Sequence, residues 1–179
     1  EPQITGQVKE AHETAHQLGL LSGILDQTFH EGFHLAKRIR SETELARRPV
    51  SLVTLVERRV HDHLAASSSP VLILGAGEMA QQALRLIRTG DRRRRVIVAN
   101  RSVGRAETLT GPDPCAGSLP LESVLLDPPA VAMVVAATSA AEPILTRDQV
   151  SAIRTAIPSD ETLLLIDLAM PPNIDPDAE

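Results

Sequence analysis

Aromatic side chains are scarce in this chain. Its 179 residues include no tryptophan, no tyrosine and only two phenylalanines. Proteins that read single-stranded nucleic acid commonly stack bases on aromatic rings, so base stacking is excluded as the main mode of binding. The net charge of −5 also argues against a surface that is basic throughout, and leaves only a local basic patch for contact with RNA.

Cysteine and long apolar runs are scarce as well. The single cysteine, Cys115, excludes an internal disulfide framework and fits a reducing compartment. Its neighbours in GPDPCAGSLP include no histidine or basic residue that would activate it, so we expect an inert thiol. No apolar run approaches the length of a membrane span, and no basic-then-apolar signal pattern opens the chain. We therefore expect a soluble, cytoplasmic protein.

The first 65 residues read as helical. Residues 1–45 carry two apolar stripes at helical spacing, interrupted at Gly19 and Gly23. Pro49 ends this run, and Ser51 is a candidate N-cap for a third helix that reaches Leu64. Residues 67–70, SSSP, predict a short linker.

After the linker, apolar runs alternate with helical patterns. Strands are expected at residues 71–74, 96–99, 131–137 and 163–166, each fully apolar as buried parallel strands tend to be. A helix is expected over residues 78–89, and Thr146 with Gln149 forms a capping-box signal for another. The pattern predicts an α/β fold, a Rossmann-like doubly wound parallel sheet preceded by an N-terminal helical segment.

The stretch VLILGAGEMA, residues 71–80, carries the most specific signal. A strand runs into Gly75, Gly77 and Ala80 with the spacing G-x-G-x-x-A and then into a helix. In a dinucleotide site the first glycine allows the turn, the second lets a pyrophosphate approach the backbone, and the small third residue lets helix and strand pack closely. The alternative is a tight strand–helix junction without a ligand. We favour the dinucleotide site.

The residues after the second expected strand indicate whether the dinucleotide is NADH or NADPH. Asn100, Arg101 and Ser102 follow the strand and Arg105 lies one turn further on, with no acidic residue before Glu107. A carboxylate here would accept from the ribose hydroxyl of NADH, whereas arginine accommodates the 2′-phosphate of NADPH. The sequence therefore favours NADPH, against the alternative of solvent-facing arginines at a helix start.

Three polar residues are expected at the same sheet edge, further along. Thr138 and Ser139 follow the third expected strand and Asp167 ends the fourth. Ligands of open α/β sheets bind outside the carboxyl ends of the strands. These side chains are therefore candidates for the nicotinamide end of the site.

Histidine pairs and an arginine run offer weaker signals. His12 and His16, like His30 and His34, are spaced i, i+4 and could bind zinc, but no third ligand is arranged in a known motif. We interpret them as solvated or partly packed histidines. Residues 92–95 are four consecutive arginines, which could contact tRNA phosphates but more simply form a solvated loop.

Six separate blocks resemble the glutamyl-tRNA reductase family. They are EPQITGQVKEA at residues 1–11, AKRIRSET at 36–43, GAGEMA at 75–80, ANRS at 99–102, ATSAAEPI at 137–144 and IDLAMPPNIDP at 166–176. The agreement covers nearly the whole chain. Shikimate dehydrogenases are similar in the nucleotide fold and in the NR after the second strand, but lack the first block.

The resemblance implies a definite chemistry. The family reduces the glutamyl group of glutamyl-tRNA(Glu) with NADPH to glutamate-1-semialdehyde, at the entry to tetrapyrrole synthesis. A cysteine thiolate forms a thioester, and hydride transfer then releases the aldehyde. The implied partners are charged tRNA(Glu), possible contact with glutamate-1-semialdehyde aminomutase, and a second copy in a homodimer.

The resemblance also assigns residues. It places Glu1, Pro2, Gln3 and Gln7 in the glutamyl pocket, and Lys37, Arg38 and Arg40 near substrate or tRNA. Arg101 and Ser102 match the end of the site that holds the 2′-phosphate. The matching cofactor loop consists of Gly75, Ala76, Gly77, Glu78, Met79 and Ala80.

The chain departs from the family in what it lacks. The family's nucleophilic cysteine lies on a domain N-terminal to EPQ, and Cys115 does not match that motif, so no catalytic residue is expected here. The implied domains are residues 1–48, the end of the catalytic domain with a connector; 49–170, the NADP-binding domain; and 171–179, the start of a linker to a C-terminal dimerisation domain. We expect a piece of a longer reductase, inactive alone.

Two other functions are alternatives to the reductase. A non-catalytic NADP-binding or regulatory module derived from the same family remains open. A dehydrogenase of the shikimate type would need a lysine–aspartate pair, and the only lysines, Lys9 and Lys37, lie in the N-terminal helices.

Overall fold

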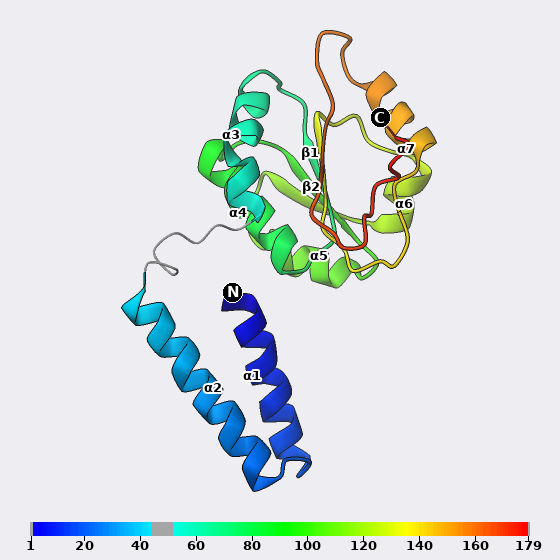
Figure 1. Cartoon of the computed structure of the whole chain (residues 1–179). Helices are drawn as coiled ribbons and strands as arrows, with labels where there is room; N and C mark the ends of the chain where they lie inside the picture. The colour runs from blue at the N-terminus through cyan, green and yellow to red at the C-terminus, as the bar shows by residue number, and fades with distance from the viewer. Residues whose placement is uncertain (1, 44–51, 179) are drawn as a thin grey trace. The chain divides into compact units, whose positions relative to one another are not determined.

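The chain divides into two compact units, residues 1–50 and 51–179. The computed structural model describes residues 2–43 and 52–178, apart from the side chains of residues 2, 3, 40 and 52–55 (Figure 1). None of the described helices is both long enough and apolar enough to cross a membrane. The predicted domain limit at 48/49 and the predicted N-cap Ser51 lie outside the described residues.

The first unit is a pair of helices, α1 (Pro2–Gln17) and α2 (Gly23–Glu42). Gly19 ends α1 with a φ of +67°, while the amide of Leu20 donates to Ala15 O and that of Gly19 to His16 O. This left-handed C-terminal motif favours glycine because glycine has no Cβ. Ser22 then starts α2, its hydroxyl accepting from the amide of Leu25. The predicted interruption between two helices is confirmed.

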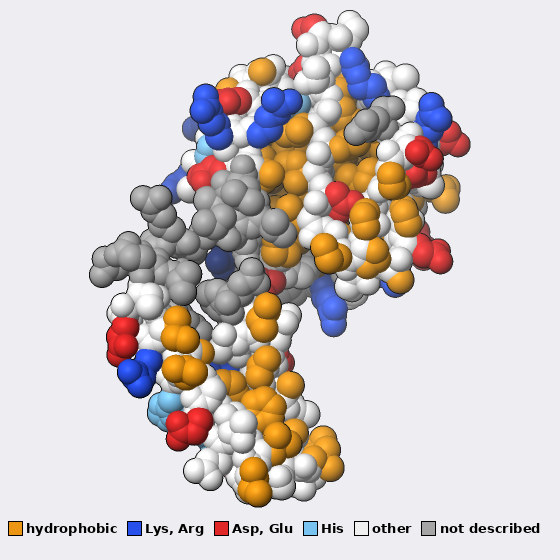
Figure 2. Space-filling model, viewed as in Figure 1, with side chains coloured by type: hydrophobic (Ala, Val, Ile, Leu, Met, Phe, Trp, Pro, Cys, Tyr) orange, Lys and Arg blue, Asp and Glu red, His pale blue; other side chains and the backbone are white. Residues whose placement is uncertain are grey.

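Much of the apolar surface of the first unit is exposed. Figure 2 shows hydrophobic side chains gathered along these helices. The large exposed hydrophobic residues of α1, α2 and their connection are Ile4, Val8, Leu18, Leu20, Ile24, Leu25, Leu35 and Ile39. Contiguous apolar surface of this kind marks a region that packs against other protein.

The second unit is built on one parallel sheet. Its strands are β1 (Val71–Leu74), β2 (Val96–Asn100), β3 (Ala116–Pro120), β4 (Met133–Ala136) and β5 (Leu164–Asp167). They lie in the order β3-β2-β1-β4-β5, and every neighbouring pair is parallel. Five parallel strands with helices between them confirm the predicted Rossmann-like α/β fold.

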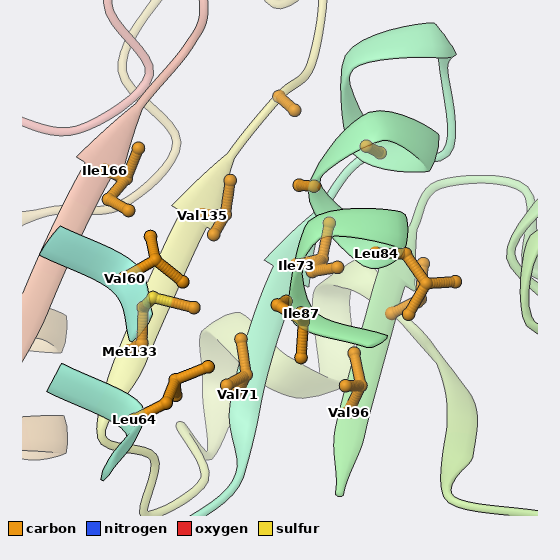
Figure 3. Close-up of a cluster of buried hydrophobic side chains, with 14 of the residues drawn as sticks. Val60, Leu64, Val71, Ile73, Leu84, Ile87, Val96, Met133, Val135 and Ile166 are labelled. Carbon is orange, nitrogen blue, oxygen red and sulfur yellow. The ribbon is translucent and has the colours of Figure 1, made fainter. Parts of the chain in front are cut away.

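Helices cover both faces of this sheet (Figure 1). The helices α3 (Leu52–Ala65), α4 (Glu78–Gly90) and α5 (Val103–Thr110) contribute to one core cluster, and α6 (Leu121–Leu126) and α7 (Arg147–Ala156) to the other. Successive residues of β1 point to opposite faces, so Val71 and Ile73 enter the first cluster and Leu72 and Leu74 the second. Figure 3 shows the first cluster, in which side chains of α3 and α4 meet the strands.

The prediction of four strands was wrong, since β3 is a fifth. Its sequence, AGSLP, contains one large apolar residue, and three of its five positions are exposed. β3 is an edge strand, so it has a neighbouring strand on one side only and is less buried than the central strands. Its sequence therefore contains few of the apolar residues by which a buried strand is recognised. β1 has the predicted limits, and the ends of β2, β4 and β5 differ from the predicted ones by at most two residues.

The last residues pack into the second unit. Ile174 and Ala178 belong to the second core cluster. The linker predicted from residue 171 therefore stays a prediction, and in this structure the segment before Glu179 contributes to the domain core.

The predicted solvated arginine loop is wrong for one residue. Arg92, Arg93 and Arg95 are exposed, but Arg94 is 8% exposed. Its guanidinium donates to Leu64 O at 2.6 Å, to Ser69 O at 3.0 Å and to Asp91 Oδ2 at 3.1 Å. Arg94 thus joins the end of α3, the segment before β1 and the turn after α4, which no local pattern indicates.

We predict that Arg94→Ala lowers the free energy of unfolding of the second unit by about 3 kcal/mol, because a buried carbonyl, a partly buried carbonyl and a carboxylate lose their donor. Chemical denaturation followed by circular dichroism measures it. Arg93→Ala, exposed in the same run, is the control and should change stability by less than about 0.5 kcal/mol. Equal effects of the two substitutions would contradict the structural role of Arg94.

Candidate functional site

The carboxyl ends of the central strands form the candidate site. β1 lies between β2 and β4, and the helices that follow β1 and β4 pack on opposite faces of the sheet. The chain therefore diverges between β1 and β4, and in open α/β sheets ligands bind at the carboxyl ends of the strands where this happens. The loop of residues 75–80 begins at this point.

Gly75 makes the turn out of β1 possible. Its φ is +111°, and a Cβ there would lie 2.8 Å from the carbonyl carbon of Ala137 and 3.3 Å from Thr138 Cγ2. Its amide donates to Ala99 O and the amide of Ala137 donates to Leu74 O, each at 2.8 Å. The backbones that leave β1 and β4 thus run against each other, and only glycine fits between them.

Gly77 has the opposite surroundings. It is exposed and caps α4 with a φ of −89°, which any residue can adopt, and a Cβ there would meet nothing within 4 Å. The fold itself therefore does not require glycine at residue 77. A missing side chain at the start of a 13-residue helix leaves room for an anionic group to approach the amides of the first turn.

Ala80 is fully buried in the first core cluster, where helix α4 meets the sheet. The rest of the loop includes Ala76 and Met79, both half-buried, and Glu78, which is exposed. The three positions of the motif thus differ in their surroundings. Gly75 lies in a tight turn, Gly77 at an open surface and Ala80 in a close contact between helix and sheet.

The predicted 2′-phosphate residues follow β2, next to β1. Asn100 Nδ2 donates to Ser102 O at 3.0 Å, and Ser102 caps α5 without a hydrogen bond from its side chain. Arg101 and Arg105 are exposed, and within the described part of the chain neither forms an ion pair. Two guanidinium groups are thus open to an anion at this edge.

Thr138 and Asp167 meet through a residue that the sequence did not single out. Asn173 is completely buried, and its Oδ1 accepts from Thr138 N at 3.1 Å and from Thr138 Oγ1 at 2.6 Å. Asp167 Oδ2 accepts from the amides of Asn173 and Ile174 at 2.7 and 2.8 Å. The hydroxyl of Thr138 therefore holds the segment after β5 in place, whereas Ser139 is exposed.

Asn173 was missed because its partners are far away in the sequence. The signal available was a single amide in the Pro-rich stretch AMPPNIDP, which directly follows the last expected strand. A buried amide needs partners for its donors and acceptor, and only the fold shows where these lie.

The predicted glutamyl-pocket residues lie in the first unit. Gln7 is exposed on α1. Pro2 and Gln3 belong to the first turn of α1, but their side chains are not among those described, and Glu1 lies outside the described residues. Lys37 and Arg38 are exposed on α2, where Arg38 pairs with Glu42 at 3.4 Å. Their place in a glutamyl pocket stays a prediction.

We predict opposite outcomes for two glycine substitutions. Gly75→Ala should destabilise the second unit by about 3 kcal/mol or more, through strain at positive φ and overlap with Ala137. Gly77→Ala should leave stability within about 1 kcal/mol but lower dinucleotide affinity at least about tenfold, because its methyl group projects into the open approach. Thermal unfolding and titration with NADPH measure both. Unchanged affinity in Gly77→Ala would show that the loop is only a structural turn.

Comparison with known proteins gives two matching domain families. Residues 1–43 match the N-terminal domain of glutamyl-tRNAGlu reductase, and residues 54–179 match the shikimate / quinate 5-dehydrogenase family.

The curated relatives of this chain include glutamyl-tRNA reductases. The chain is 38% identical over 177 residues to that of Xanthomonas campestris pv. phaseoli and 37% identical over 179 residues to that of Stenotrophomonas maltophilia. These matches cover 98–99% of this chain but 41% of each relative, so the chain spans about two fifths of their length.

A solved structure agrees with the sequence relatives. Glutamyl-tRNA reductase from Methanopyrus kandleri matches with 29% identity and a TM-score of 0.61, over all of this chain and 45% of that one. The chain belongs to the glutamyl-tRNA reductase family, and it combines a segment that matches the N-terminal domain of that family with a nucleotide-binding domain of the dehydrogenase type.

Proposed function

We propose that this chain is the cofactor-binding part of an NADPH-dependent enzyme that reduces glutamyl-tRNA(Glu) to glutamate-1-semialdehyde, the first step of tetrapyrrole synthesis. The observation that carries the proposal is the contrast between Gly75, which the fold requires, and Gly77, which it does not. A glycine with open space at a helix N-terminus and a sheet switch point is what a bound pyrophosphate needs.

The preference for NADPH is supported by charge at the end of β2. Arg101 and Arg105 offer planar donor groups to a 2′-phosphate, and no carboxylate between residues 100 and 106 competes for the ribose. Ser102 and Asn100 complete the proposed adenosine end. The nicotinamide end is proposed near Ser139 and Thr138.

The reducing group is the dihydronicotinamide, which would supply a hydride when bound. This chain's own part is to hold the dinucleotide along the carboxyl edge of the sheet and to orient it. The hydrogen bonds of Asn173 to Thr138 and Asp167 keep the β4–β5 side of that edge in one arrangement. Fixed geometry of this kind reduces the entropic cost of bringing two reactants together.

The nucleophile has to come from outside this chain. Cys115 directly precedes β3, at the amino edge of the sheet, and its carbonyl accepts from the amide of Val96. A five-residue strand spans about 16 Å, so the thiol lies at the opposite end of the sheet from the proposed cofactor site. The family resemblance implies that the thiolate and part of the glutamyl pocket are supplied by the N-terminal domain, to which residues 1–43 belong.

The exposed apolar side chains of α1 and α2 support the proposal that another part of the N-terminal domain supplies the thiolate. Hydrophobic surface on both helices is suited to pack against further parts of that domain. Charged tRNA(Glu) is then the proposed substrate of the whole protein, and the homodimer and the contact with glutamate-1-semialdehyde aminomutase stay predictions.

The cofactor preference is tested by calorimetric titration with NADPH and NADH. We expect NADPH to bind more tightly, and the double variant Arg101→Ala/Arg105→Ala to lose about tenfold to a hundredfold in NADPH affinity, since charge-assisted hydrogen bonds contribute about 1.5–3 kcal/mol. NADH affinity should stay nearly unchanged. Arg93→Ala, exposed at the other edge of the sheet, is the control. Equal losses for both cofactors would contradict a 2′-phosphate site.

The reaction is tested by comparing two proteins. The 179-residue chain alone should give no NADPH-dependent aldehyde from glutamyl-tRNA, because it supplies no nucleophile. A longer protein that includes the cysteine-bearing N-terminal domain of the relatives should give it. If this longer protein binds NADPH but forms neither thioester nor aldehyde, the regulatory-module alternative replaces the reductase.

A further inference from the structure

Three potential metal ligands meet between the two helices of the first unit. His12 on α1 lies 2.8 Å from Asp26 on α2, measured from Nε2 to Oδ1. His30, one turn after Asp26, has its Nε2 3.8 Å from the same oxygen. All three ligand atoms lie within 4.8 Å of one another.

These distances bracket what a tetrahedral zinc ion requires. With metal–ligand bonds of about 2.0–2.2 Å, neighbouring ligand atoms in a tetrahedral site are separated by about 3.3 Å. To bind an ion, His12 Nε2 and Asp26 Oδ1, now 2.8 Å apart, have to move apart slightly. His30 Nε2, now 3.8 Å from the same oxygen, has to move closer. Two imidazoles and one carboxylate form a donor set that zinc accepts, with water in the fourth position.

Packing already holds the least accessible ligand in place. The side chain of His12 is 10% exposed, and its ring centroid lies 5.3 Å from that of Phe29 and 5.5 Å from that of Phe33. These two residues are the only aromatic side chains in the chain. A ring fixed in this way loses little conformational freedom when it binds a metal.

The other two ligands provide access from solvent. Asp26 is 32% exposed and His30 62% exposed, so an ion can enter from the outer side of the helix pair. Asp26 sits in the first turn of α2, and its amide donates to Ser22 O, which fixes the helix start. Spaced i, i+4, Asp26 and His30 share one face of α2.

A hydrogen bond alone does not account for His30. The contact of His12 with Asp26 is complete at 2.8 Å, but His30 Nε2 lies 3.8 Å from Oδ1, beyond hydrogen-bond distance. The three ligand atoms, all within 4.8 Å of one another, are therefore close enough for one ion to bridge.

We propose that His12, Asp26 and His30 bind one divalent zinc-class cation, which links α1 to α2. The site uses one member of each histidine pair seen in the sequence, together with a carboxylate between them. Within the described part of the first unit, the ion would join two helices that otherwise share few buried contacts.

The test is titration of the metal-free 179-residue chain with Zn²⁺ by calorimetry, and with Co²⁺ followed by its visible absorption. We expect one equivalent to bind with the spectrum of a tetrahedral site. His30→Ala, at an exposed position that tolerates truncation, and Asp26→Asn should each lower the affinity at least about tenfold, since losing even an indirect support of a metal ligand commonly costs 10–100-fold.

His34→Ala is the matched control, because His34 is an exposed histidine one turn further along α2. It should change the affinity less than about twofold. Zn²⁺ should also raise the melting temperature of the wild-type chain and not that of His30→Ala. Absence of binding by the wild type, or equal losses in His30→Ala and His34→Ala, would overturn the proposal.

Discussion

The second unit depends on the close approach of two backbones, those of Gly75 and Ala137. The chain leaves β1 and β4 toward opposite faces of the sheet, so the two exits meet at one edge and must pass each other. Glycine at residue 75 permits the contact, and the hydrogen bonds of Gly75 to Ala99 and of Ala137 to Leu74 hold it. This crossing brings the loop after β1 beside the loop after β4, at the place where open α/β sheets bind their ligands.

The amino ends and the carboxyl ends of the parallel strands carry different kinds of polar group. At the amino edge, Arg94 satisfies carbonyls at the end of α3 and before β1, so its charge is used for structure. At the carboxyl edge, Arg101 and Arg105 are exposed. A buried charge has to be paired because its desolvation is costly, whereas an exposed charge is hydrated and needs no partner within the protein. Arginines close together in the chain thus differ in burial and in pairing according to the end of the strands at which they lie.

The first unit differs from the second in what can stabilise it. Its helices leave many large apolar side chains exposed, and the contacts between them include those of His12 with Asp26, Phe29 and Phe33. A helix pair of this size has too small a core for much stability of its own. Two sources of stabilisation suit it, both as proposals: packing of the exposed face against the rest of the N-terminal domain, and a cation between the helices.

The sequence by itself determined the fold class and the place of the glycine loop, because strand and helix periodicity and the G-x-G-x-x-A spacing are local features. The family came from the resemblance of six separate sequence blocks, which can also be read without the fold. The sequence could not show β3, whose edge position needs few apolar residues, nor separate Arg94 from its exposed neighbours. Only the tertiary structure decided that Gly75 is required and Gly77 is not, that Asn173 joins Thr138 to Asp167, and that His12 and His30 meet at Asp26. Each of these depends on contacts between segments far apart in the chain, which no local pattern specifies.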